Sequence, residues 1–191
     1  MVPADYEHMK EKTTMTTFPH TNDPDLSAAH GVRTRTVRWH DPLATAELGR
    51  GLSGRDFLTK WMRGDIPGAP MGELMGFRLV DVAEGEVSFA CAPDESVYNP
   101  IGMVHGGLAC TVLDSAAGCA VHSTLPAGFG YSSIEIKVSF LRPIQAYKGD
   151  IVARGWVTKA GKRAGFAEAD LRDGHGTVLA TASSTCLIVA R

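Results

Sequence analysis

The amino-acid sequence predicts an α+β fold, in which an antiparallel sheet packs on one long central helix. The first observation is an almost continuous apolar segment over residues 104–121, which is long enough for a buried helix of about five turns. The second is a set of short β-prone segments, two before this helix and four after it. Turns of hairpin length join most of these segments, so neighbouring strands are expected to be antiparallel.

Each element has its own local signal. The first two strands form a hairpin around Glu84-Gly85, and the helix starts near His105 and ends ahead of Pro126. In the next strand apolar and polar residues alternate, which places Ile134 and Val138 on one face and Ser133 on the other. The six expected strands comprise residues 77–82, 86–91, 133–142, 150–158, 164–172 and 178–189.

The chain divides into three regions by composition. The beginning is polar and shows no periodicity, which predicts a flexible leader. Charged and β-prone residues then alternate, and this pattern predicts an extended arm that lies on the body or on a partner subunit. A Ser-x-x-Asp cap and a closing glycine predict a short helix after the arm. The expected regions are a leader (1–30), an N-terminal arm and helix (31–70, with the arm at 33–39 and the helix at 54–63) and the main domain (71–191).

Composition excludes several classes of function. A formal net charge of -2 leaves no basic surface for nucleic acid. The apolar segment contains His105 and Asp114 and is too short and too polar for a membrane span. The four cysteines form no C-x-x-C pair and the histidines no metal-spaced cluster, so we expect neither a metal nor a cofactor. Reduced thiols and the lack of a signal-peptide pattern predict a cytoplasmic protein.

The strongest functional signal is the turn that precedes the long helix. Residues 99–107 read Asn-Pro-x-Gly-x-x-His-Gly-Gly, and the helix after them carries the acid Asp114. Glycines at a helix start expose backbone N–H groups that can stabilise a developing negative charge. A single carboxylate in an apolar helix is costly unless it is paired or used. The pattern predicts a site where an acid and a backbone amide act together.

Two motifs together resemble a known family. The turn motif with the helical Leu-Asp pair at 113–114, and the strand motif Ser-x-Glu-x-Lys-Val-x-Phe-Leu-Arg-Pro over residues 133–143, are similar to those of hotdog-fold acyl-CoA thioesterases. The phenylacetate-pathway (PaaI-like) branch, which includes the Arthrobacter-type 4-hydroxybenzoyl-CoA thioesterases, is the most similar. The resemblance covers about residues 72–189. It implies a curved antiparallel sheet of five to six strands wrapped around the helix, and assembly into homodimers and often homotetramers.

The resemblance also implies roles for individual residues. Asn99 would position the substrate, and the Gly106 N–H would polarise the thioester carbonyl. The Asp114 carboxylate would act as general base or as nucleophile. A serine that orients water in some members corresponds best to Ser133, with Ser132 as the second choice.

Further positions have supporting roles. His105 is expected to fix the turn by hydrogen bonds, with a catalytic role as general base as the alternative, and Gly107 offers a second amide beside the substrate. Other members carry threonine one helical turn after the acid, where this chain has Gly118. The phosphates of coenzyme A favour nearby cations. The candidates for binding them are Arg142, Lys162 and Arg163.

Spacing constrains how the site is assembled. Gly106 and Asp114 are eight residues apart, which is about 12 Å along a helix. One carbonyl cannot contact both groups of one chain, so a shared reaction requires two subunits with antiparallel helices. The leading hypothesis is therefore a homodimeric acyl-CoA thioesterase. The alternatives are a non-catalytic acyl-CoA-binding module and, with less support, a hotdog dehydratase or hydratase.

Overall fold

The computed structural model describes residues 31–191, and the leader expected over residues 1–30 lies outside this range. Residues 37–191 make up one compact unit, which contains every helix and strand named below. Residues 31–40, which include the predicted arm, have no regular secondary structure and expose nearly all of their side chains.

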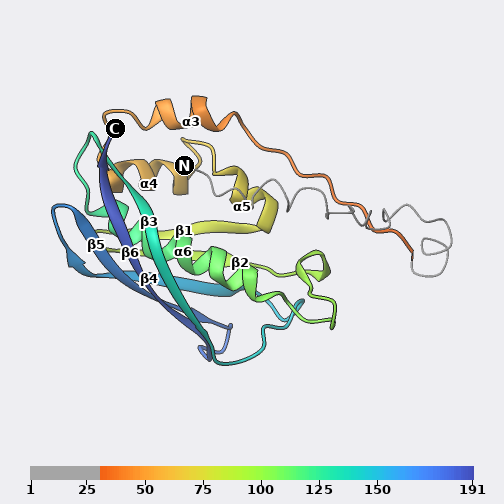
Figure 1. Cartoon of the computed structure of the whole chain (residues 1–191). Coiled ribbons are helices and arrows are strands. Elements are labelled where there is room, and N and C mark those ends of the chain that lie inside the picture. Colours follow the sequence, from red (N-terminus) through yellow and green to blue (C-terminus); the bar gives the residue numbers. More distant parts are fainter. Residues whose placement is uncertain (1–30) are drawn as a thin grey trace, which may run out of the picture. The chain divides into compact units, whose positions relative to one another are not determined.

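One antiparallel sheet of six strands curves around the long helix α6 (Gly106–Ser123) (Figure 1). The strand order is β1-β2-β4-β5-β6-β3, so β1 and β3 are the two edge strands. This architecture confirms the predicted α+β fold with a curved sheet around one central helix. The strands are β1 (Phe77–Ala83), β2 (Glu86–Cys91), β3 (Phe129–Phe140), β4 (Ile151–Ala160), β5 (Ala164–Arg172) and β6 (Val178–Ala190).

The core lies between α6 and the concave face of the sheet. Leu108, Val112 and Leu113 of α6 are almost fully buried there. Close packing of helix and sheet depends on Gly155 of β4, because a Cβ at this position would lie 2.3 Å from the Ala116 carbonyl oxygen. The apolar segment that predicted the helix is therefore buried by strands on both sides of it in sequence, β2 as well as β4 and β5.

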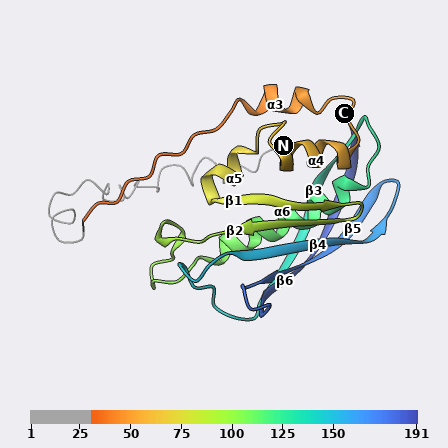
Figure 2. The same cartoon turned by 180° about the vertical axis from the view of Figure 1, so that it is seen from behind.

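Three shorter helices precede the sheet, and Figure 2 shows α4 and α5 beside β1. Helix α4 (Gly54–Arg63) confirms the predicted helix, since the Ser53 hydroxyl accepts the Asp56 N–H and Gly64 ends the helix in the left-handed conformation. Two further helices, α3 (Pro42–Leu48) and α5 (Pro70–Met75), and the 3-10 turn η1 (Glu95–Val97) were not expected. Helices α3 and α5 each begin with a proline, a residue that fits the first helical position.

The register of β3 differs from the expected alternation. Ser133 pairs with the buried Cys186, and a bulge between Ser133 and Glu135 inserts one residue into the strand. After the bulge, Ile136 pairs with the buried Ser184. Directly paired residues share one sheet face, so Ser133 lies on the same face as Ile136 and Val138. The prediction that Ser133 points to the opposite face is wrong, because strict alternation cannot detect a bulge.

Acidification is expected to destabilise this fold through His122, near the end of α6. Its ring lies between Phe57 and Tyr131, and burial, assisted by Arg191, lowers its pKa to about 4. The unfolded chain therefore binds a proton that the folded chain does not, between about pH 6.5 and pH 4. Stability should fall by about 3 kcal/mol as the pH drops through this window.

Urea unfolding of the wild type and of His122→Gln at several pH values measures this contribution. The variant should lose stability less steeply below about pH 6.5, while His175→Gln, at an exposed turn, should keep the wild-type slope. Equal slopes for the wild type and His122→Gln would show that His122 is not the group responsible.

Candidate active site

Backbone and side-chain hydrogen bonds shape the loop before α6. The His105 N–H donates to the Val97 carbonyl oxygen at 2.8 Å and thereby closes the loop. Inside it, Oδ1 of Asn99 accepts the N–H groups of Ile101 (3.1 Å) and Met103 (3.0 Å). Asn99 thus holds the turn with its carbonyl oxygen. Its amide nitrogen makes no hydrogen bond within residues 31–191 and can donate to a substrate.

The first turn of α6 leaves one amide free. Nδ1 of His105 accepts the Gly107 N–H at 2.8 Å, and the His105 carbonyl oxygen accepts the Leu108 N–H at 3.0 Å. His105 thus caps α6 in this geometry. The Gly107 amide is committed to the cap and is not the free second amide that was expected beside the substrate. Within the described part of the chain, the Gly106 N–H has no acceptor. It lies at the positive end of the helix dipole, where an oxyanion is favoured.

A cavity of about 450 Å³ lies beside Gly106, and its walls include Phe140 and Arg142. A Cβ on Gly106 would lie 3.0 Å from the Phe140 ring, so glycine here allows close approach. Gly106 therefore borders a space that a substrate can enter.

Asp114 lies half-buried in α6. Its Oδ1 atom is buried and has no hydrogen-bond donor among the described residues. The nearby Thr111 and Ser115 hydroxyls donate instead to the carbonyl oxygens of Gly107 and Thr111, at 2.9 and 2.8 Å. A purely structural role, in which Asp114 bonds a neighbouring backbone group, has no support in these contacts.

The groups around Asp114 come from β3, β6 and the next turn of α6. Burial raises the pKa of the Cys119 thiol to about 12, and the Asp114 carboxylate adds to this shift. Burial also raises the pKa of Cys186, while Ser184 and Ser133 lower it and Asp114 raises it. Ser133 and Asp114 thus both act on the Cys186 thiol. Both thiols stay protonated at neutral pH, which excludes them as nucleophiles.

The two candidate serines lie on opposite faces of the sheet. Ser133 pairs with the fully buried Cys186, whereas Ser132 is exposed and pairs with Leu187, which is 42% exposed. The structure brings Ser133 to the face of the sheet that Asp114 approaches and places Ser132 on the outer face.

Tyr131 is the site residue that sequence reasoning missed. A Cβ at Gly118 would lie 2.4 Å from the Tyr131 ring and 2.7 Å from its hydroxyl oxygen. The ring therefore occupies the space beside the helix where other family members are expected to carry threonine. Burial raises the pKa of Tyr131 well above its usual value, so the hydroxyl keeps its proton. A glycine on the helix opposite an aromatic residue on the adjoining strand was the available signal.

The candidate cations lie at opposite ends of the molecule. Arg142 lines the cavity beside Gly106. Lys162 lines a cavity of about 400 Å³ beside Thr124, beyond the other end of α6. Arg163 stands next to it, and its carbonyl oxygen accepts the Ile188 N–H. Within one chain, only Arg142 of these three candidates lies near the free amide.

Two classes of site find no support in the described residues. Residues 31–191 contain no group of three or more His, Cys, Asp or Glu side chains able to hold a metal ion. In the same part of the chain, no helix is both long and apolar enough to span a membrane.

Comparisons with known proteins agree with the fold. Residues 101–180 match the family model described as the thioesterase superfamily. The Halobacterium salinarum protein VNG_1336C, named as a possible esterase, is 34% identical over 56% of this chain and 76% of its own length. Human acyl-coenzyme A thioesterase 13 is 32% identical over 49% of this chain, and the match spans 65% of that enzyme, just under two thirds.

A solved structure gives the same result. The phenylacetic acid degradation-related thioesterase candidate of Ralstonia eutropha has a TM-score of 0.62 and 27% identity, over 68% of this chain and 98% of that chain. Sequence, family model and fold thus agree on one assignment. The chain belongs to the thioesterase superfamily of hotdog-fold thioester hydrolases.

Proposed function

We propose that the chain is an acyl-CoA thioesterase, which hydrolyses an acyl- or aryl-CoA thioester to the free acid and coenzyme A. The observation that carries this proposal is the buried Asp114 oxygen without a donor, on the same helix as an unused Gly106 N–H. An unsatisfied buried carboxylate costs about 1–3 kcal/mol or more. The presence of the unpaired Asp114 carboxylate is explained if this group acts on the substrate. The acyl-coenzyme A thioesterase among the relatives supports the choice of substrate class.

The proposed active site is shared between two copies of the chain. The α6 positions that are only half-buried form one stripe of small and polar residues, while the following turns are buried. Strand β3 lies beside this helix as an unpaired sheet edge, and its Ile134 and Phe140 side chains are 60% and 57% exposed. An unpaired edge with apolar side chains is suited to pairing with another strand. The stripe consists of Gly106, Gly107, Cys110, Thr111, Asp114 and Ser115.

A two-fold dimer resolves the spacing problem. Helix α6 runs without a break from Gly106 to Ser123, so Gly106 and Asp114 of one chain stay about 12 Å apart. If two α6 stripes meet in antiparallel orientation, Gly106 of one copy approaches Asp114 of the other. The dimer then holds two equivalent sites, and association of two dimers would leave both sites intact.

The reaction needs no cofactor in this scheme. The Gly106 N–H and the Asn99 amide bind the carbonyl oxygen and stabilise the negative charge that develops on it. Asp114 either removes a proton from water as it attacks, or attacks directly and forms an anhydride that water then opens. In both cases the carbon–sulfur bond breaks, water supplies the new oxygen, and the coenzyme A thiolate leaves and takes a proton. In this scheme the Ser133 hydroxyl orients the water.

A thiol-release assay over short, medium and aryl acyl-CoA thioesters tests this function. We expect catalytic turnover with at least one thioester, and the acyl preference will follow from the panel. Because four free thiols fit a reducing compartment, we propose cytoplasmic thioesters as the substrates. Acyl-CoA binding without thiol release would contradict the proposal and indicate a non-catalytic binding module.

A further inference from the structure

Two adjoining cavities form a groove that leads away from the Gly106 amide. The first is the cavity of about 450 Å³ beside Gly106. The second, about 460 Å³, lies between the β3–β4 loop and the β5–β6 turn. Both are lined by Arg142, Pro143 and Leu179, so a ligand with its reacting carbon at Gly106 can extend into the second cavity.

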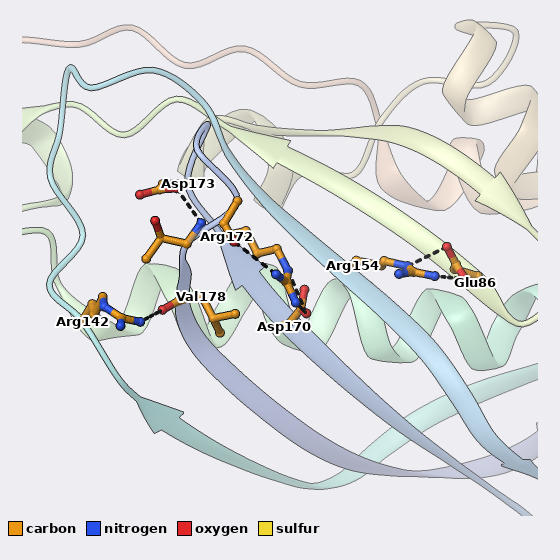
Figure 3. A network of polar contacts seen from close by, with 9 residues as sticks. Glu86, Arg142, Arg154, Asp170, Arg172, Asp173 and Val178 are labelled. Carbon is orange, nitrogen blue, oxygen red and sulfur yellow. Dashed lines mark hydrogen bonds and ion pairs between the residues drawn. The ribbon is translucent and has the colours of Figure 1, made fainter.

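The far cavity carries cations that no carboxylate neutralises. Nη1 of Arg142 donates to the Val178 carbonyl oxygen at 2.8 Å (Figure 3). This bond fixes the guanidinium and leaves its other N–H groups for a ligand. Lys148 also lines this cavity and forms no ion pair within residues 31–191. His175 lies on the facing turn.

The two acids that line the same cavity are already engaged. Asp150 forms an ion pair with Arg78 at 2.6 Å. Oδ1 of Asp173 accepts the N–H groups of Thr177 (2.8 Å) and His175 (2.9 Å), and these bonds, that of Thr177 first, lower the pKa of Asp173. Neither carboxylate forms an ion pair with Arg142 or Lys148 within the described residues, so these two cations are left for an anionic ligand.

The loop that presents Lys148 is held in a strained conformation. Tyr147 is the only non-glycine residue among the described ones with a positive φ, at 60°. A tyrosine in this conformation costs about 1–2 kcal/mol. Two hydrogen bonds maintain it, from the Tyr147 N–H to the Pro93 carbonyl oxygen and from the Glu95 N–H to the Tyr147 hydroxyl. Lys148 therefore stands on a fixed loop rather than on a freely moving one.

We propose that the far cavity binds the nucleotide phosphates of coenzyme A, with Lys148 and Arg142 as the phosphate ligands and His175 at the rim. This inference rests on the proposed function, because the pantetheine arm would occupy the groove and present the thioester to Gly106. It assigns Lys148 and His175 to substrate binding. It also predicts that the enzyme selects free coenzyme A thioesters over the phosphopantetheine thioesters of carrier proteins, which lack the 3′-phosphate.

Steady-state hydrolysis of three thioesters tests the proposal. They carry the same acyl group on coenzyme A, on 3′-dephospho-coenzyme A or on N-acetylcysteamine. Lys148→Gln should raise KM for the coenzyme A thioester about tenfold and leave kcat unchanged. It should not affect the N-acetylcysteamine thioester, which has no phosphate. Lys148→Arg should restore most of the affinity, and Lys60→Gln, on the exposed face of α4, should behave as the wild type.

Two further outcomes separate this site from the proposed function. An unchanged KM for acyl-CoA in Lys148→Gln, or an equal rise for the phosphate-free thioester, would overturn the phosphate site while the thioesterase function stands. If no thioester is hydrolysed, calorimetric titration with adenosine 3′,5′-bisphosphate still tests the site, because binding should weaken in Lys148→Gln. A lower KM for an acyl carrier protein than for acyl-CoA would contradict the assignment to coenzyme A.

Discussion

Asp114→Asn is expected to lower kcat for thioester hydrolysis by at least about 100-fold, the contribution typical of a positioned general base. Asparagine has nearly the same shape but can neither take a proton from water nor attack the carbonyl carbon. The same change should leave the free energy of unfolding equal or higher, because the amide avoids burying an unpaired charged oxygen. Thiol-release kinetics and urea unfolding measure the two effects.

The combination of lost activity and retained stability is diagnostic. Substitution of a residue that only supports the fold would change stability and leave kcat largely intact, and Asp170 offers the comparison because its Oδ1 is also buried without a donor. Asp170 lies on the outer face of the sheet, bound to Arg172 (Figure 3), so Asp170→Asn should change stability and leave kcat near the wild-type value. Full turnover in Asp114→Asn would exclude Asp114 as the reacting acid.

Gly106→Pro is expected to reduce kcat by about 100- to 1000-fold, the loss typical for one oxyanion donor. Proline removes the free N–H yet fits this position, since Gly106 is the first residue of α6 and proline favours that place. The preceding His105 has φ -66° and ψ 136°, which are compatible with a following proline. The helix should therefore form as before, as circular dichroism can confirm.

Gly106→Ala is the matched control for this experiment. Like proline, it adds a Cβ that contacts the Phe140 ring, but it keeps the N–H. Phe140 is 57% exposed and can move aside. A much smaller loss in Gly106→Ala than in Gly106→Pro assigns the effect to the hydrogen-bond donor. Equal losses would instead assign it to crowding of the cavity.

The sequence was sufficient for the fold because its local signals agree with one another. Alternating strands, hairpin turns and one apolar helix allow few arrangements. The structural features that the sequence analysis missed have specific causes. The β3 bulge at Ser133 adds one residue without any turn signal, and the short helix α3 (Pro42–Leu48) buries none of its residues and so lacks an apolar pattern.

The site was predictable where it depends on local chemistry. The His105 cap follows from residues adjacent in sequence. The position of Tyr131 against Gly118 depends on how β3 packs across α6, so the glycine and the aromatic residue indicate the contact only once that packing is known. The groove from Gly106 to Lys148 likewise joins two loops that meet only in the folded chain.

Complementation between inactive chains tests the shared active site most directly. Asp114→Asn and Gly106→Pro chains, each carrying a different affinity tag, are co-expressed and the mixed dimers are isolated. Each mixed dimer would contain one site with both groups intact, so we predict about half of the wild-type activity per dimer. Isolated mixed dimers that are no more active than either single-variant dimer would contradict the account, because they would show that Gly106 and Asp114 do not meet across the interface.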